Sequence, residues 1–151
     1  MTPATIESWL SLALWTAGIG HFVVLAASFQ IPRRLGWKED IAKLTNFNRK
    51  LMWTYGGFIV RVIAAFGALT LSLHQELMNG DRAALFVTGF IGVFWLARII
   101  VDFVYFGQGD WPRGPGMVVG HLLLTSLFIC LTSTYFGVIA WHWYVNQGGL
   151  S

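Results

Sequence analysis

Four long apolar stretches dominate this sequence of 151 residues and constrain its fold more than any motif does. They cover residues 9–30, 51–73, 84–106 and 117–144. A helix needs about 20 apolar residues to cross the hydrocarbon core of a bilayer, where every backbone polar group must be hydrogen-bonded within the protein. We therefore predict an all-α integral membrane protein, an up-down bundle of four transmembrane helices in a single domain over residues 1–151.

The composition agrees with a chain that is surrounded by lipid. Charged residues make up 11% of the sequence, and the mean hydropathy is +0.61. A soluble domain usually contains about 25% charged residues, so this chain lacks the side chains to cover a water-facing surface. The connection 31–50 holds six of the ten Lys and Arg residues. Such a cluster beside membrane spans reports topology, and we expect the lipid bilayer, not nucleic acid, as the partner.

The distribution of basic residues predicts the orientation. Connections 31–50 and 107–116 together hold seven Lys and Arg residues, whereas the N-terminus, the second connection and the C-terminus hold only Arg82. The positive-inside rule therefore places these two connections in the cytoplasm and both termini on the non-cytoplasmic side. Within the basic connection, residues 37–44 have the spacing of a short amphipathic helix at the interface.

Five ionisable residues fall inside the predicted spans, where a charge that faces lipid costs several kcal/mol. Counted from the helix ends, all five lie in the cytoplasmic half, so we expect them to point inward and converge. Arg98 and Asp102 are four residues apart, share a helical face and are expected to form an internal ion pair. The five candidate site residues are His21, Arg61, Arg98, Asp102 and His121.

The fourth span carries one mostly polar stripe. Its members recur in alternating steps of four and three residues, which is the spacing of one face of an α-helix. A polar stripe on a membrane helix belongs in the bundle core or along a hydrated crevice, although hydroxyl groups also satisfy themselves on nearby carbonyls or a neighbouring helix. The stripe consists of His121, Thr125, Phe128, Thr132, Tyr135, Ile139 and His142.

Two histidines on different helices are the arrangement that a bis-histidine haem requires. The first interpretation is therefore a redox-associated protein that binds b-type haem or a quinone. His21 and His121 would hold the haem iron, and Arg61, Arg98 and Asp102 would line the cofactor site, where an arginine pairs with haem propionates or a quinone carbonyl. The arrangement resembles four-helix b-type cytochromes in architecture and histidine placement alone.

Other interpretations of the same cluster stay open. In an oligomeric transporter or channel it would line an anion or proton path, and in a lipid-binding protein it would hold a lipid. In an accessory subunit of a larger membrane complex, polar groups contact partner helices and carry no chemistry. In a lipid-modifying enzyme, His21 or His121 would act as the base. No motif singles out catalytic residues, and the partner is either another membrane protein or a second copy.

Two further features lie near the membrane surfaces. The segment Asn46–Tyr55 combines basic and aromatic side chains that suit either an anionic lipid headgroup or a plain interfacial anchor. At the opposite surface, Glu7, His74, Glu76 and His142 form a weaker candidate metal set, because their spacing matches no metal-binding motif.

Overall fold

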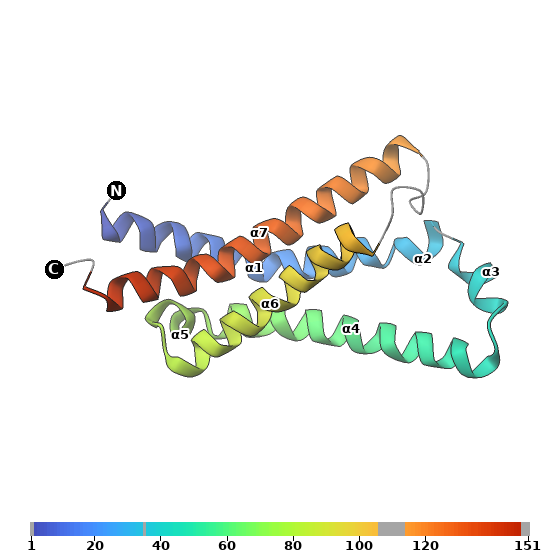
Figure 1. Cartoon of the computed structure of the whole chain (residues 1–151), viewed down its shortest axis with the longest axis horizontal. Coiled ribbons are helices and arrows are strands. Elements are labelled where there is room, and N and C mark those ends of the chain that lie inside the picture. Colours follow the sequence, from blue (N-terminus) through green and yellow to red (C-terminus); the bar gives the residue numbers. More distant parts are fainter. Residues whose placement is uncertain (1, 35, 106–113, 149–151) are drawn as a thin grey trace.

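The computed structural model describes residues 2–34, 36–105 and 114–148, and within these ranges every regular element is a helix. Each of the four long helices is long and apolar enough to cross a membrane. This indicates a multi-pass membrane protein and confirms the predicted helical class (Figure 1). In chain order the helices are α1 (Pro3–Ser28), α2 (Ile31–Arg34), α3 (Trp37–Ala42), α4 (Asn46–Ser72), α5 (His74–Asn79), α6 (Arg82–Val104) and α7 (Pro115–Asn146).

The long helices begin earlier than the apolar stretches that predict them. α1 starts at Pro3, because proline lacks the backbone N–H that a first helical turn leaves unpaired. α4 starts at Asn46, because the Thr45 side chain accepts a hydrogen bond from the backbone N–H of Asn48 and caps the helix. These first turns add polar length outside the apolar part of each span. The amphipathic helix expected over residues 37–44 is present as α3.

Consecutive long helices run antiparallel and form two pairs (Figure 1). α1 packs along α4, α6 packs along α7, and the contact of α1 with α7 joins the two pairs. The described residues nearest to both termini lie at one end of the molecule together with α5, which we call the terminal end. α2 and α3 lie at the opposite end, which we call the connection end.

α1 and α4 approach closely at two glycines. A Cβ atom on Gly67 would lie 2.7 Å from the Phe22 ring and 3.1 Å from the carbonyl oxygen of Gly18. A Cβ atom on Gly18 would lie 2.5 Å from the Leu71 side chain. A side chain at either position would require the Phe22 or Leu71 side chain to shift, and the contact of Gly67 with the Gly18 carbonyl oxygen shows that the two backbones approach closely, as they commonly do where membrane helices cross on small residues.

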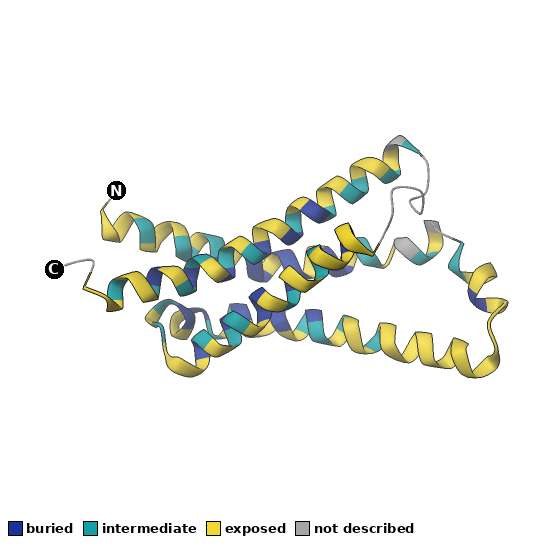
Figure 2. Cartoon of the chain, in the orientation of Figure 1, coloured by how far each residue is buried: buried dark blue, intermediate teal, exposed yellow. Residues whose placement is uncertain are grey.

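α4 separates from the other long helices toward the connection end. It meets α6 beyond its midpoint, where the Phe66 ring contacts the rings of Phe90 and Phe94 at centroid distances of 5.9 and 5.1 Å. Every residue from 46 to 56 is exposed, whereas most buried residues gather in the middle of the molecule and toward the terminal end (Figure 2). The first half of α4 is therefore largely uncovered by the other long helices.

Candidate functional site

His21 lies at the centre of the bundle with none of its surface exposed. The indole Nε1–H of Trp95 in α6 donates a hydrogen bond to its Nε2 over 3.0 Å. Since Nε2 accepts, the ring proton is on Nδ1, which donates to the carbonyl oxygen of Ala17 over 2.7 Å. His21 is therefore a neutral imidazole whose two nitrogens are both hydrogen-bonded within the protein.

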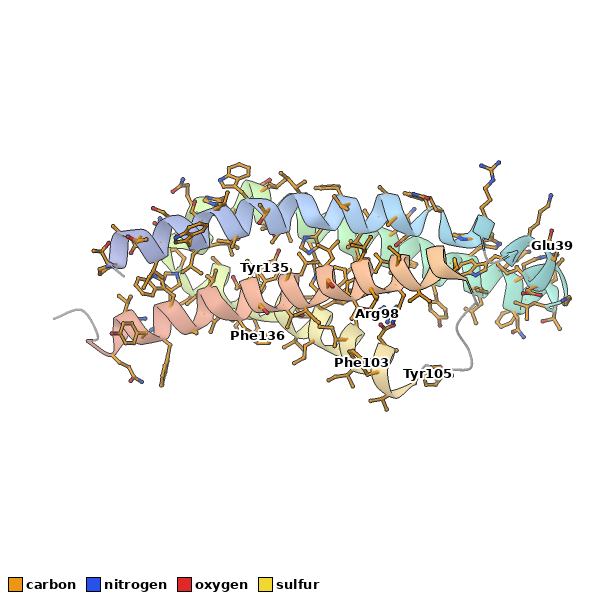
Figure 3. All side chains as sticks on the ribbon, turned by 90° about the horizontal axis from the view of Figure 1, so that it is seen from above. Glu39, Arg98, Phe103, Tyr105, Tyr135 and Phe136 are labelled. Carbon is orange, nitrogen blue, oxygen red and sulfur yellow. The ribbon has the colours of Figure 1, made fainter. Side chains whose placement is uncertain are left out.

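A second hydrogen-bonded pair adjoins His21. The hydroxyl of Tyr135 in α7, a fully buried residue, lies 2.6 Å from Oγ1 of Thr70 in α4. Thr70 has one hydroxyl proton and donates it to the carbonyl oxygen of Phe66 over 2.8 Å. The Tyr135 hydroxyl is therefore the donor to Thr70. Figure 3 shows Tyr135 on the side of α7 that faces α1.

Aromatic rings pack around His21 from three helices. The ring centroids of Trp95, Tyr135 and Phe66 lie 5.5, 5.9 and 6.1 Å from that of His21, each in an edge-on geometry. These residues and Thr70 come from all four long helices, so they join the bundle at one level. We call them the His21 cluster: His21, Phe66, Thr70, Trp95 and Tyr135.

A second polar group, the Asp102 cluster, lies between α6 and α7 and consists of Arg98, Asp102, His121 and Thr125. Oδ1 of Asp102 accepts a hydrogen bond from Nη1 of Arg98, and Oδ2 accepts one from Oγ1 of Thr125, both over 3.1 Å. Nε2 of His121 lies 3.8 Å from Oδ2. The Asp102 side chain is 3% exposed and that of Arg98 is 37% exposed. The predicted ion pair is confirmed, and Figure 3 shows Arg98 between the two helices.

The predicted polar stripe of α7 is confirmed as an inward face, because none of its seven residues is exposed. Thr125, Phe128 and Tyr135 are buried, and the remaining four are partly buried. The stripe supplies Tyr135 to the His21 cluster and Thr125 to the Asp102 cluster. The stripe therefore contributes to two separate hydrogen-bonded clusters at different levels of the bundle, while Thr132 and His142 donate to the backbone carbonyl oxygens of Phe128 and Leu77.

Arg61 lies apart from both clusters. It is exposed on α4, and its guanidinium carbon lies 5.8 Å from the ring centroid of Phe58 on the same helix. Phe66 and Gly67, which face α6 and α1, follow it by five and six residues, so Arg61 is turned by about 140° and 120° around the helix from them. Arg61 therefore points away from the other long helices. The five predicted site residues lie in three places instead of one.

The predicted haem pair does not fit this arrangement. Tyr135, which contacts His21, is 14 residues from His121 along α7, or about 21 Å at the rise of an α-helix. Histidines at such different levels cannot present ring nitrogens to opposite faces of one iron. Ligation by His21 would also remove the hydrogen bond that Trp95 donates. A quinone carbonyl would need a donor, and the donors of the His21 cluster already bind protein groups.

The weaker metal set at the terminal end is dispersed. His74 stacks on Trp15 at a centroid distance of 4.9 Å, and its Nε2 lies 3.3 Å from the hydroxyl oxygen of Ser11. Nε2 of His142 donates to the carbonyl oxygen of Leu77 over 3.2 Å. Among the residues that the structure describes, no group of three or more His, Cys, Asp or Glu side chains is placed to hold a metal ion.

Trp95 and Thr70 are partners in the His21 cluster that the pattern of ionisable residues does not reveal. Both carry a polar group that needs a partner when it is buried in a membrane helix. Both residues are among the neutral hydrogen-bond donors of the predicted spans, so they are candidates once neutral side chains are considered together with the ionisable ones. The spacing of residues along the sequence does not indicate which helix supplies the hydrogen-bond partner of each.

No protein-family model, curated protein sequence or solved structure matches this chain.

Proposed function

We propose that the protein is an accessory subunit of a larger membrane complex and binds a different membrane protein through the outer face of α4. The observation that carries this proposal is Arg61, an exposed arginine near the middle of an apolar helix. No carboxylate among the described residues pairs with it, whereas Arg98 pairs with Asp102. Because a charged side chain within a membrane span is costly unless it is paired, an arginine in this position needs an acidic partner from outside the chain.

The depth of Arg61 makes its exposure costly. It lies 15 residues from Asn46 and 11 residues from Ser72, the two ends of α4, or about 22 and 17 Å at 1.5 Å per residue. The hydrocarbon core is about 30 Å thick, so Arg61 lies near its centre. An arginine there costs roughly 3 kcal/mol on insertion scales. Pairing with a carboxylate on a neighbouring helix removes much of that cost.

The face around Arg61 is suited to close packing of another helix. Its members lie within about 40° of Arg61 around the helix axis at 3.6 residues per turn, and all but the partly buried Gly57 are exposed. A Cβ atom on Gly57 would meet no atom within 4 Å. Small side chains let the backbones of membrane helices approach each other. The outer face of α4 consists of Thr54, Gly57, Arg61, Ala65, Ala68 and Ser72.

A second copy of this chain does not supply the acidic group. Of the seven Asp and Glu residues, none in the described ranges lies near the middle of a long helix. Asp102 is two residues from the end of α6 and already pairs with Arg98, and Glu7 is four residues from the start of α1. A symmetric contact through α4 would also bring two Arg61 side chains together. The occupant is therefore a different polypeptide with an Asp or Glu inside a transmembrane helix.

The four long helices cross the bilayer as an up-down bundle in this proposal. The basic connection 31–50 lies in the cytoplasm, and both termini lie on the opposite side, in accord with the distribution of Lys and Arg. An alkaline phosphatase fused to the C-terminus is expected to be active and a fluorescent protein fused there dark. The reverse pattern contradicts the orientation but leaves the argument for Arg61 intact.

The proposal is tested with a photo-crosslinking amino acid at Ala65, on the outer face of α4, in native membranes. We expect one discrete adduct with a different protein, lost when Arg61→Leu is added and retained with Arg61→Lys. The same amino acid at Leu123, an exposed residue of α7, should give no such adduct. Arg82→Leu is the matched control, because it removes an exposed arginine from the first position of α6.

The identified partner then allows a charge-exchange test. Arg61→Asp should abolish the adduct, and replacing the partner's membrane-embedded carboxylate with arginine should restore it. An adduct between two copies of this chain contradicts the proposal. An adduct that survives Arg61→Leu, or a partner without an acidic residue facing the crosslinked position, contradicts it as well. Labelling of lipid alone at Ala65 means that Arg61 is neutralised by phospholipid.

A further inference from the structure

The connection end contains an open pocket of about 540 Å³. Its lining residues belong to α2, α3 and the first two turns of α4, so the α4 residues are 7 to 21 positions along the chain from those of α2 and α3. The polar and apolar side chains around it come from three helices. The residues that line it are Pro32, Arg33, Lys38, Ile41, Ala42, Arg49 and Trp53.

The pocket is strongly cationic. Arg33, Lys38 and Arg49 contribute three positive charges, and no acidic side chain lines it. Arg49 donates a hydrogen bond to the neutral amide oxygen of Asn46 over 2.9 Å, which leaves its charge uncompensated. Among the described residues, none of these three cations forms an ion pair. Three like charges gathered in one concave site favour an anion.

One acidic residue of α3 is already engaged outside the pocket. Asp40 pairs with Lys43 over 2.8 Å, and neither residue lines the pocket. This hydrogen bond and the charge of Asp40 raise the pKa of the Lys43 ammonium above its usual value. Asp40 therefore compensates the positive charge of Lys43, whereas the positive charges that line the pocket have no such partner among the described residues. The position of Asp40 in the fold, and not the net charge of the chain, determines which of these cations has an acidic partner.

The remaining wall of the pocket is apolar. Ile41 is 5% exposed and Trp53 is 58% exposed, and Pro32 and Ala42 add further apolar surface. A tryptophan beside basic side chains at the end of a membrane helix is typical of the level of the lipid headgroups. A ligand with an anionic head and an apolar body matches both walls, and an inorganic anion matches only one.

We propose that this pocket binds the phosphate group of an anionic phospholipid. Arg33, Lys38 and Arg49 bind the phosphate oxygens, with the guanidinium groups donating charge-assisted hydrogen bonds. Trp53 and Ile41 contact the glycerol and the upper acyl chain. The site is independent of the outer face of α4, since Arg61 does not line it. The proposed lipid site therefore does not depend on whether the protein binds another membrane protein.

Native mass spectrometry of the purified full chain in neutral detergent tests the site. The probes are phosphatidylglycerol, phosphatidylcholine and inorganic phosphate. We expect one retained phosphatidylglycerol and at least tenfold weaker binding of phosphatidylcholine and of phosphate. Replacing the three cations of the pocket together (Arg33→Gln, Lys38→Gln, Arg49→Gln) should weaken binding of phosphatidylglycerol at least tenfold. Trp53→Ala should weaken binding of the lipid and leave that of inorganic phosphate unchanged.

A matched control removes two positive charges from outside the pocket, Lys50→Gln and Arg82→Gln, and is compared with Arg33→Gln plus Arg49→Gln inside it. The control should bind phosphatidylglycerol as the unmodified protein does, and circular dichroism should show equal helix content in both double variants. Equal loss in the two variants overturns the proposal, because it reports net charge only. Equal binding of phosphatidylcholine overturns it too. Tight binding of inorganic phosphate that displaces the lipid identifies a soluble phosphate as the ligand and overturns the assignment to lipid.

Discussion

The indole of Trp95 donates its only hydrogen bond to Nε2 of His21 over 3.0 Å, and this contact joins α6 to α1 at the centre of the bundle. Both side chains are at most 1% exposed. Water therefore cannot replace either partner, and the histidine acceptor depends on the indole. An unsatisfied acceptor at this depth costs about 1–3 kcal/mol.

We expect Trp95→Phe to lower the free energy of unfolding by about that amount. The phenyl ring keeps a stacking surface for Phe128, whose centroid lies 5.0 Å from that of Trp95, but offers no donor. Thermal unfolding in detergent measures the loss. Trp143→Phe serves as the control, because Trp143 is 67% exposed, and it should leave the melting temperature unchanged. Equal melting temperatures for the two variants contradict the role of the hydrogen bond.

The hydrogen bond between Tyr135 and Thr70 is expected to appear as an energetic coupling. A double-mutant cycle with Tyr135→Phe and Thr70→Val should give about 0.6–1.7 kcal/mol, which spans the average and the maximum measured for hydrogen bonds between membrane helices. Thr88→Val provides a matched control, because Thr88 is also fully buried and also donates to a carbonyl four residues earlier. Its effect should add to that of Tyr135→Phe within about 0.5 kcal/mol. Coupling of similar size in both cycles contradicts a direct bond.

Removing one member of the Asp102 ion pair should cost more than removing both. Asp102→Leu leaves the Arg98 guanidinium without its acceptor and Thr125 without its own. Breaking a buried pair costs about 3–5 kcal/mol. We expect less here, about 1–3 kcal/mol, because 37% of the Arg98 side chain is exposed. The double variant Arg98→Leu with Asp102→Leu should recover part of the loss in a thermal unfolding measurement. A double variant less stable than the single one argues against an unpaired charge as the cause.

Much of the fold follows from local spacing along the sequence. The four apolar stretches identify the long helices because length and hydropathy are properties of each segment alone. The ion pair of Arg98 with Asp102 and the inward stripe of α7 follow from the 3.6-residue period in the same way. Each prediction needs only one helix, and each is confirmed.

Predictions that depend on two helices at once are less successful. His21 and Trp95 are 74 residues apart, and Thr70 and Tyr135 are 65 residues apart. Their pairing depends on which helices are neighbours and on how each is rotated, and a helical period fixes neither. Arg61 shows the same limit: its depth could be counted from the helix end, but its direction could not. The expected convergence of five residues assumed an inward direction for all of them.

The contact between α1 and α4 provides the most direct check on that direction. Gly67→Ala would place a Cβ atom 2.7 Å from the Phe22 ring, and we expect it to lower the free energy of unfolding by about 1–3 kcal/mol, as overpacking typically does. Gly56→Ala is the matched control on the same helix, because a Cβ atom there meets nothing within 4 Å. It should be neutral or slightly stabilising, since alanine favours a helix over glycine by about 1 kcal/mol.

The comparison of these two variants by thermal unfolding also bears on Arg61. Gly67 faces α1, and Arg61 is turned away from it by about 120° on the same rigid helix. If Gly67→Ala is clearly destabilising and Gly56→Ala is not, the rotation of α4 is established and Arg61 must face outward. If both are tolerated equally, α4 has a different rotation, and Arg61 no longer requires a partner from another protein. The relative stability of these two alanine variants therefore tests whether Arg61 faces outward, as the proposed function requires, without any knowledge of the partner.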